Sequence, residues 1–135
     1  MKKVLLTALV GMFLFGCASN EIVIQPNAPV NFVAKQERRG DYNFIVPSNF
    51  YLVESESFIY ENGPVYRAYL LYKGEGFIQD IVKFFDTNME KAGWKKESAT
   101  IGRDAVLAYS KEGQRIVIKI SYGITNTYLK MLLTR

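Results

Sequence analysis

Apolar and polar residues alternate most clearly along residues 115–122. Every second position from Ile116 to Tyr122 is apolar, whereas Arg115, Lys119 and Ser121 occupy positions between them. A two-residue period is typical of a β-strand that buries one face. Segments rich in Tyr, Phe, Val and Ile predict further strands at residues 50–60, 65–73, 95–101, 104–110 and 127–134.

Residues 77–92 follow a helical period instead. Acidic Asp80 near the start and Lys91 near the end suit the helix dipole, and Gly93 provides a natural stop. We therefore predict one amphipathic helix that packs its apolar side on a sheet. The apolar residues fall within one arc of about 160° and are Phe77, Ile78, Ile81, Val82, Phe84, Phe85, Met89 and Ala92.

Short turns separate the predicted strands. Asn62-Gly63 is a strong signal for a tight hairpin, and Gly113 lies in a second short connection. Strands joined in this way pair antiparallel. The sequence therefore predicts an α+β fold, in which an antiparallel β-sheet of about five to six strands carries one amphipathic helix packed on one face.

The sheet face that points away from the helix is expected to combine tyrosine with basic residues. Such side chains suit protein or glycan contacts because they offer flat amphipathic area and several hydrogen-bond donors. The same composition also describes an ordinary outer face on which long side chains lie over apolar neighbours. The residues of this predicted partner-binding face are Arg67, Tyr69, Lys73, Arg115, Lys119, Tyr128 and Lys130.

The first seventeen residues have the pattern of an export signal. Lys2 and Lys3 precede an apolar run from Val4 to Phe15. Twelve helical residues span about 18 Å, which is short of a bilayer core of about 30 Å. A cleaved signal peptide is therefore favoured over a permanent transmembrane helix.

Leu14-Phe15-Gly16-Cys17 resembles the lipobox of bacterial lipoproteins, although Phe15 is bulkier than usual at its position. The resemblance implies that Cys17 is lipidated and becomes the new N-terminus, with acyl chains holding the protein to a membrane. Ala18 is not the aspartate that retains lipoproteins at the inner membrane, so the resemblance favours the outer membrane, facing the periplasm. The alternative is an ordinary core cysteine.

We therefore divide the chain into three parts. Residues 1–16 form a lipoprotein signal peptide, residues 17–46 form the lipidated N-terminus and a tether, and residues 47–135 form a single α+β domain. Pro26, Pro29 and a charged stretch at residues 35–41 indicate the tether.

The order of elements in residues 64–135 also resembles that of small bacterial envelope lipoproteins of unassigned function. A strand ending in Tyr72-Lys73-Gly74 precedes an aromatic-rich helix that ends in Gly93-Trp94, and a meander of strands follows. More loosely, it is similar to helix-on-sheet domains of lipoproteins in the outer-membrane assembly machinery. The likeness is architectural and implies no catalytic motif.

Composition removes several kinds of chemistry. The chain has no His, and Cys17 is its single cysteine, so Ser-His and Cys-His nucleophile pairs are excluded. Gly74-Glu75-Gly76 lacks the remaining residues of a phosphate-binding loop. We therefore expect no metal, no cofactor and no enzymatic activity.

Glu54 and Glu56 are the best candidates for a catalytic pair. Two residues apart on a strand, they would lie about 6.6 Å apart, within reach of glycosidase geometry. The same spacing describes a solvated strand face, which we favour.

Formal charge argues against one class of partner. It is +4 for the chain, but Lys2 and Lys3 belong to the leader, so residues 17–135 carry +2. We expect no nucleic-acid partner from a chain so close to neutrality.

The sequence thus predicts a lipid-anchored envelope lipoprotein that acts as a non-catalytic interaction or scaffolding module, with an envelope protein or glycan as partner. The alternative is a lipoprotein that binds a small ligand or glycan, and an envelope hydrolase is a third, weaker hypothesis.

Overall fold

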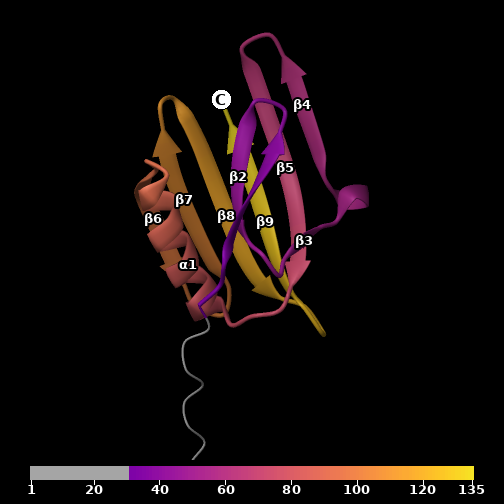
Figure 1. Ribbon diagram of the computed structural model, residues 1–135, viewed down its shortest axis with the longest axis vertical. Helices are drawn as coiled ribbons and strands as arrows, with labels where there is room; N and C mark the ends of the chain where they lie inside the picture. Colours follow the sequence, from indigo (N-terminus) through magenta and orange to yellow (C-terminus); the bar gives the residue numbers. More distant parts are fainter. Residues whose placement is uncertain (1–30) are drawn as a thin grey trace, which may run out of the picture.

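Seven antiparallel strands form the main sheet in the computed structural model, which describes residues 31–135 (Figure 1). The spatial order is β3-β5-β9-β8-β7-β6, and β4 also pairs with β5. The predicted antiparallel α+β fold is therefore confirmed. The strands are β3 (Tyr51–Leu52), β4 (Phe58–Asn62), β5 (Val65–Gly74), β6 (Lys95–Ile101), β7 (Ala105–Lys111), β8 (Gln114–Tyr122) and β9 (Thr127–Thr134).

The strand expected at residues 50–60 is split. A 3-10 turn at Glu54–Glu56 separates β3 from β4, and both strands pair with β5. Residues 54–57 are four polar residues in succession, so this segment has no alternate apolar side chain to bury. The split explains why the main sheet has one strand more than the six predicted segments.

Helix α1 (Ile78–Lys91) covers one face of the sheet beside β6, β7 and β8. Its buried side includes Ile81 and Phe85, each with no exposed surface. The Tyr122 hydroxyl accepts a hydrogen bond from Ile78 N–H at 3.0 Å, which satisfies one free donor at the helix start. Gly93 has φ +86° and ends the helix as the sequence predicts.

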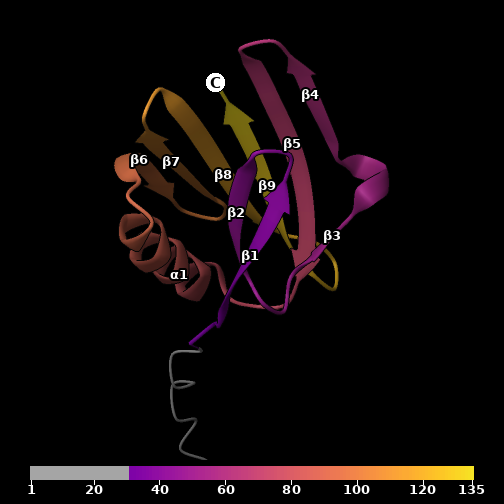
Figure 2. The ribbon, with the colours of Figure 1, turned by 45° about the horizontal axis from the view of Figure 1, so that its top comes forward.

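A hairpin of β1 (Ala34–Arg39) and β2 (Tyr42–Pro47) lies beside α1 on the same face of the main sheet (Figures 1 and 2). Phe44 and Val46 of β2 are buried in the core. The Phe32 ring contacts those of Phe50 and Phe84 edge-on, with centroids 6.4 Å and 6.3 Å apart. The folded domain therefore begins before residue 47, and residues 34–46 do not form the expected tether.

The core lies between the main sheet and the layer made by α1 and the hairpin. Every second residue of the central strands points into it, as Leu70, Ile118 and Met131 do. Gly74 ends β5 in close contact with Asn49 and Phe50. A Cβ at this position would lie 2.7 Å from Asn49 O, so a larger residue would clash there. The opposite face of the sheet carries no second layer within residues 31–135.

Candidate functional site

The strand register places all seven residues of the predicted partner-binding face on the uncovered side of the sheet. Arg67 of β5 and Arg115 of β8 both pair with Thr134 of β9, while Lys119 of β8 pairs with Lys130 of β9. Paired residues in antiparallel strands point to the same side. We call this surface the outer face.

An apolar row crosses the middle of the outer face. Tyr69 pairs with Leu132, which pairs with Val117 on its other side. The Phe58 ring stacks on the Tyr69 ring at a centroid distance of 5.8 Å. Phe58 is 61% exposed and Leu132 is 42% exposed, so this row offers apolar area to a partner.

Basic residues flank the apolar row on both sides. Arg115 pairs with Glu97 at 3.2 Å, and Lys119 contacts Asp104 at 3.7 Å. Among residues 31–135, Arg67, Lys73 and Lys130 have no ion-pair partner. The outer face therefore keeps an excess of positive charge that would attract acidic groups.

Two residues of the outer face are less available than the sequence suggests. The Tyr128 ring is half-buried because it lies against Gly123 in the loop before β9. Leu71 also belongs to this side of β5, yet it is only 5% exposed. The centre of the available surface is thus the row of Phe58, Tyr69 and Leu132.

Glu54 and Glu56 do not share a strand face. They lie in the exposed 3-10 turn between β3 and β4, so the geometry expected of a carboxylate pair is not present. Within residues 31–135, no three His, Cys, Asp or Glu side chains come together as a group that could hold a metal ion.

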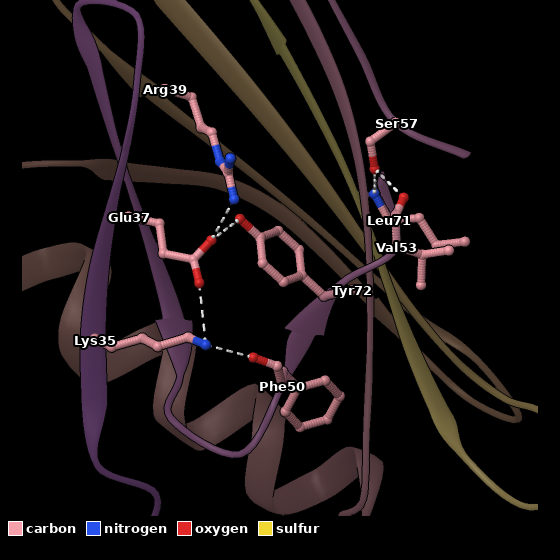
Figure 3. A network of polar contacts seen from close by, with 8 residues as sticks. All are labelled: Lys35, Glu37, Arg39, Phe50, Val53, Ser57, Leu71 and Tyr72. Carbon is pink, nitrogen blue, oxygen red and sulfur yellow. Dashed lines mark hydrogen bonds and ion pairs between the residues drawn. The ribbon is translucent and has the colours of Figure 1, made fainter. Parts of the chain in front are cut away.

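A partly buried polar network joins the hairpin to the main sheet (Figure 3). Glu37 of β1 accepts hydrogen bonds from Tyr72 Oη at 2.7 Å and from Arg39 Nη2 at 3.1 Å. Lys35 Nζ lies 3.0 Å from Glu37 and donates to the Phe50 carbonyl at 2.6 Å. Two partners of Glu37 therefore belong to its own strand β1, and Tyr72 of β5 supplies the link to the main sheet.

The network shifts the ionisation of its members. Burial opposes the charge of Glu37, but hydrogen bonds from Tyr72, Lys35 and Arg39 outweigh it and hold the Glu37 pKa below its usual value. Burial, followed by the hydrogen bond to Glu37, raises the pKa of Tyr72. Glu37 therefore stays ionised and Tyr72 stays protonated across the physiological range.

Sequence reasoning missed this network. Lys35, Glu37 and Arg39 lie in the stretch that predicted a tether, because a run of charges usually marks a solvated segment. Their alternation with Gln36 and Arg38 was the available signal. Lys35, Glu37 and Arg39 point inward, whereas Gln36 and Arg38 point outward.

A small hollow of about 240 Å³ adjoins the network at the β4 edge of the sheet. Arg39 lines this hollow, and its Nε is buried without a hydrogen-bond partner among the described residues. Arg39 and Glu54 supply charge, Ser57 supplies a hydroxyl, and four side chains are apolar. The lining residues are Arg39, Leu52, Glu54, Ser57, Phe58, Ile59 and Leu70.

Residues 1–30 lie outside the part that the structure describes, and so does Cys17. The one helix within residues 31–135 is too short and too polar to cross a bilayer.

No family model and no curated protein matches this chain. Among solved structures, the chain is similar to PA94 from Pseudomonas aeruginosa, a protein of unknown function. The two share 15% identity at a TM-score of 0.43, over 75% of this chain and 82% of the other.

Proposed function

We propose that this protein is a lipid-anchored envelope lipoprotein whose domain acts as a non-catalytic interaction module. The outer face carries the proposal, because an apolar-aromatic row flanked by basic residues lies uncovered on one side of the sheet. The lipobox-like segment that ends at Cys17 supports the anchoring. The proposed location is the outer membrane, facing the periplasm.

The chemistry of the outer face favours an envelope protein with an acidic, partly apolar surface. Phe58, Tyr69 and Leu132 supply area that a partner would remove from water. Arg67 and Lys130 stand on either side of this row, and neither has an ion-pair partner among the described residues. Such an arrangement gives affinity at its centre and orientation at its rim.

An acidic glycan is a second candidate, favoured by the ring of Tyr69 and the nearby cations. A sugar ring can stack on an aromatic side chain while Lys130 and Arg67 contact carboxylate or phosphate groups. If the purified protein binds isolated acidic envelope polysaccharide with no other envelope protein present, the glycan candidate is favoured over the first.

Photo-cross-linking from the outer face tests the binding proposal. A photoreactive amino acid at Leu132 should join the protein in cells to one envelope partner, whereas the same amino acid at the exposed Lys83 of α1 should not. Equal adducts from both positions, or none from Leu132, would contradict the proposal.

The anchor is tested separately with Cys17→Ser. This variant should lose labelling by a fatty-acid analogue and should keep its leader or leave the membrane, because the acylated sulfur is gone. Labelling that persists in the variant would show that Cys17 is not the acylated residue.

A further inference from the structure

The two edges of the main sheet differ in a way that singles out β4. Phe58, Ile59 and Tyr60 of β4 are 61%, 41% and 50% exposed. By contrast, β6 at the opposite edge starts with Lys95, Lys96 and Glu97, which are the charges that usually keep an edge from pairing. The β4 edge is therefore apolar and unprotected by charge over most of its length.

Within residues 31–135, the backbone of β4 has hydrogen-bonding groups that no other strand pairs with. Leu71 N–H donates to Ser57 Oγ, and Leu71 O accepts from Val53 N–H, so both groups of Leu71 point toward this edge. Antiparallel strands alternate, so Arg67 and Tyr69 also direct their groups toward β4. The backbone N–H and C=O groups of their partners Tyr60 and Phe58 point toward β5. Those of Ile59 and Glu61 therefore point away from β5, to the open edge of the sheet.

The hollow next to β4 supplies a charged counterpart. Ile59 and Arg39 both line it, and so does the carboxylate-bearing Glu54. An arginine has five N–H donors, and Glu37 takes Nη2, so donors remain for a second carboxylate. Arg39 Nε is buried and out of reach of a second chain, but the Arg39 side chain as a whole is 31% exposed, so an incoming carboxylate would meet its terminal nitrogens.

We propose that two copies of this chain associate by pairing β4 with β4 antiparallel, around a two-fold axis at Tyr60. In this register the backbone N–H and C=O of Ile59 in one copy form two hydrogen bonds with the backbone C=O and N–H of Glu61 in the other. Glu61, whose carboxylate lies against Gly40 of its own copy, then pairs with Ile59 of the second copy, which lines the hollow together with Arg39. The proposal is independent of the proposed function.

Two other registers satisfy the same backbone groups but fit less well. Pairing Glu61 with itself places two carboxylates directly opposite each other, which is unfavourable. Pairing Ile59 with itself sets Glu61 opposite Ser57 rather than Ile59. The Tyr60 axis alone sets both Glu61 side chains next to the apolar Ile59 and the basic Arg39.

The contact involves one strand of five residues from each copy. Stable dimers usually bury about 1,200–2,000 Å², and a single short strand pair buries less. The association is therefore weak in dilute solution, and it strengthens as the local concentration of the chain rises.

Disulfide trapping in the full chain, in cells, tests this register. Tyr60→Cys should form a disulfide-linked dimer with itself on mild oxidation, because residues on the axis face each other. Phe58→Cys should not link to itself but should link to Asn62→Cys when the two variants are expressed together. Thr100→Cys, exposed on β6, is the matched control, and the unmodified chain reports any background from Cys17.

Glu61→Lys in the Tyr60→Cys background should lower the dimer yield, with dimer affinity falling about ten-fold because two favourable charge contacts are lost. Dimer from Tyr60→Cys at no more than the Thr100→Cys level would overturn the proposal. So would a Tyr60→Cys adduct with a different polypeptide, or a yield that Glu61→Lys leaves unchanged.

Discussion

Glu37 forms a polar link between the hairpin and the main sheet, beside the apolar contacts of Phe44 and Val46. Its carboxylate accepts hydrogen bonds from Tyr72 and Arg39 and pairs with Lys35. Loss of the charge would leave two partly buried cations without their counter-charge. Partly buried charges cost free energy when they lose their partner, so this one residue supports a layer of the fold.

Glu37→Gln should lower the free energy of unfolding by about 1–2 kcal/mol, since charged hydrogen bonds become neutral ones. Urea unfolding followed by circular dichroism measures this change. Glu54→Gln is the matched control, because Glu54 lies exposed in the 3-10 turn and should be neutral. Equal stability of the two variants would contradict the role of Glu37.

The same residue predicts a pH dependence. The pKa of Glu37 lies below its usual value in the folded protein, so its contribution is complete above about pH 4.5 and is lost as the pH falls through the folded pKa. The melting temperature of Glu37→Gln should therefore fall less steeply than that of the unmodified chain as the pH is lowered below about 4.5. Parallel curves would show that Glu37 does not drive the acid transition.

At the scale of elements, the Ser57 side chain supplies hydrogen bonds in the connection from β3 to β4, where the strand-to-strand backbone hydrogen bonds are interrupted. Ser57 Oγ accepts a hydrogen bond from Leu71 N–H at 3.0 Å and donates one to Val53 O at 2.8 Å. This hydroxyl continues the edge of the sheet where the 3-10 turn interrupts it (Figure 3).

Ser57→Ala should destabilise the protein by about 1 kcal/mol, because it leaves Leu71 N–H without a partner at a partly buried position. Hydrogen exchange should speed up at Leu71 in particular. Ser55→Ala, in the exposed turn two residues earlier, should change neither quantity. Unchanged protection of the Leu71 amide in Ser57→Ala would contradict this interpretation.

The elements differ in how far the sequence predicts them. Strands β5 to β9 and helix α1 have clear periods, and their predicted bounds agree with the structure to within a residue or two. The hairpin was missed because its inward row, Lys35, Glu37 and Arg39, has the composition of a solvated surface. The burial of residues 34–39 alternates along the strand, but Tyr72, the partner that favours an inward row of charges, lies on another strand and is not visible in the local sequence.

The outer face shows the same limit. Alternation along β5, β8 and β9 was enough to place its residues on one side of the sheet. The contribution of Phe58 was missed, because its stacking on Tyr69 depends on the split between β3 and β4. The cover that Gly123 provides for Tyr128 also depends on a loop conformation that the sequence does not specify.

At the scale of the whole molecule, the main sheet has one face that is covered and one that is uncovered by residues 31–135. The helix and the hairpin bury the first, and Phe58, Tyr69 and Leu132 lie across the second. In the proposed function, the uncovered face meets a partner while Cys17 holds the chain at the membrane. The β4 edge provides a separate contact for a second copy.

The most direct test of the outer face is the yield of the photo-cross-linked adduct from Leu132 in cells. We predict one envelope adduct, reduced about ten-fold or more when Arg67→Glu and Lys130→Glu are added, because the rim charges then repel an acidic partner. The control pair Arg38→Glu and Lys83→Glu, on other exposed surfaces, should leave the yield unchanged. An adduct that responds equally to both pairs, or that does not form, would contradict the assignment of the outer face as the binding surface.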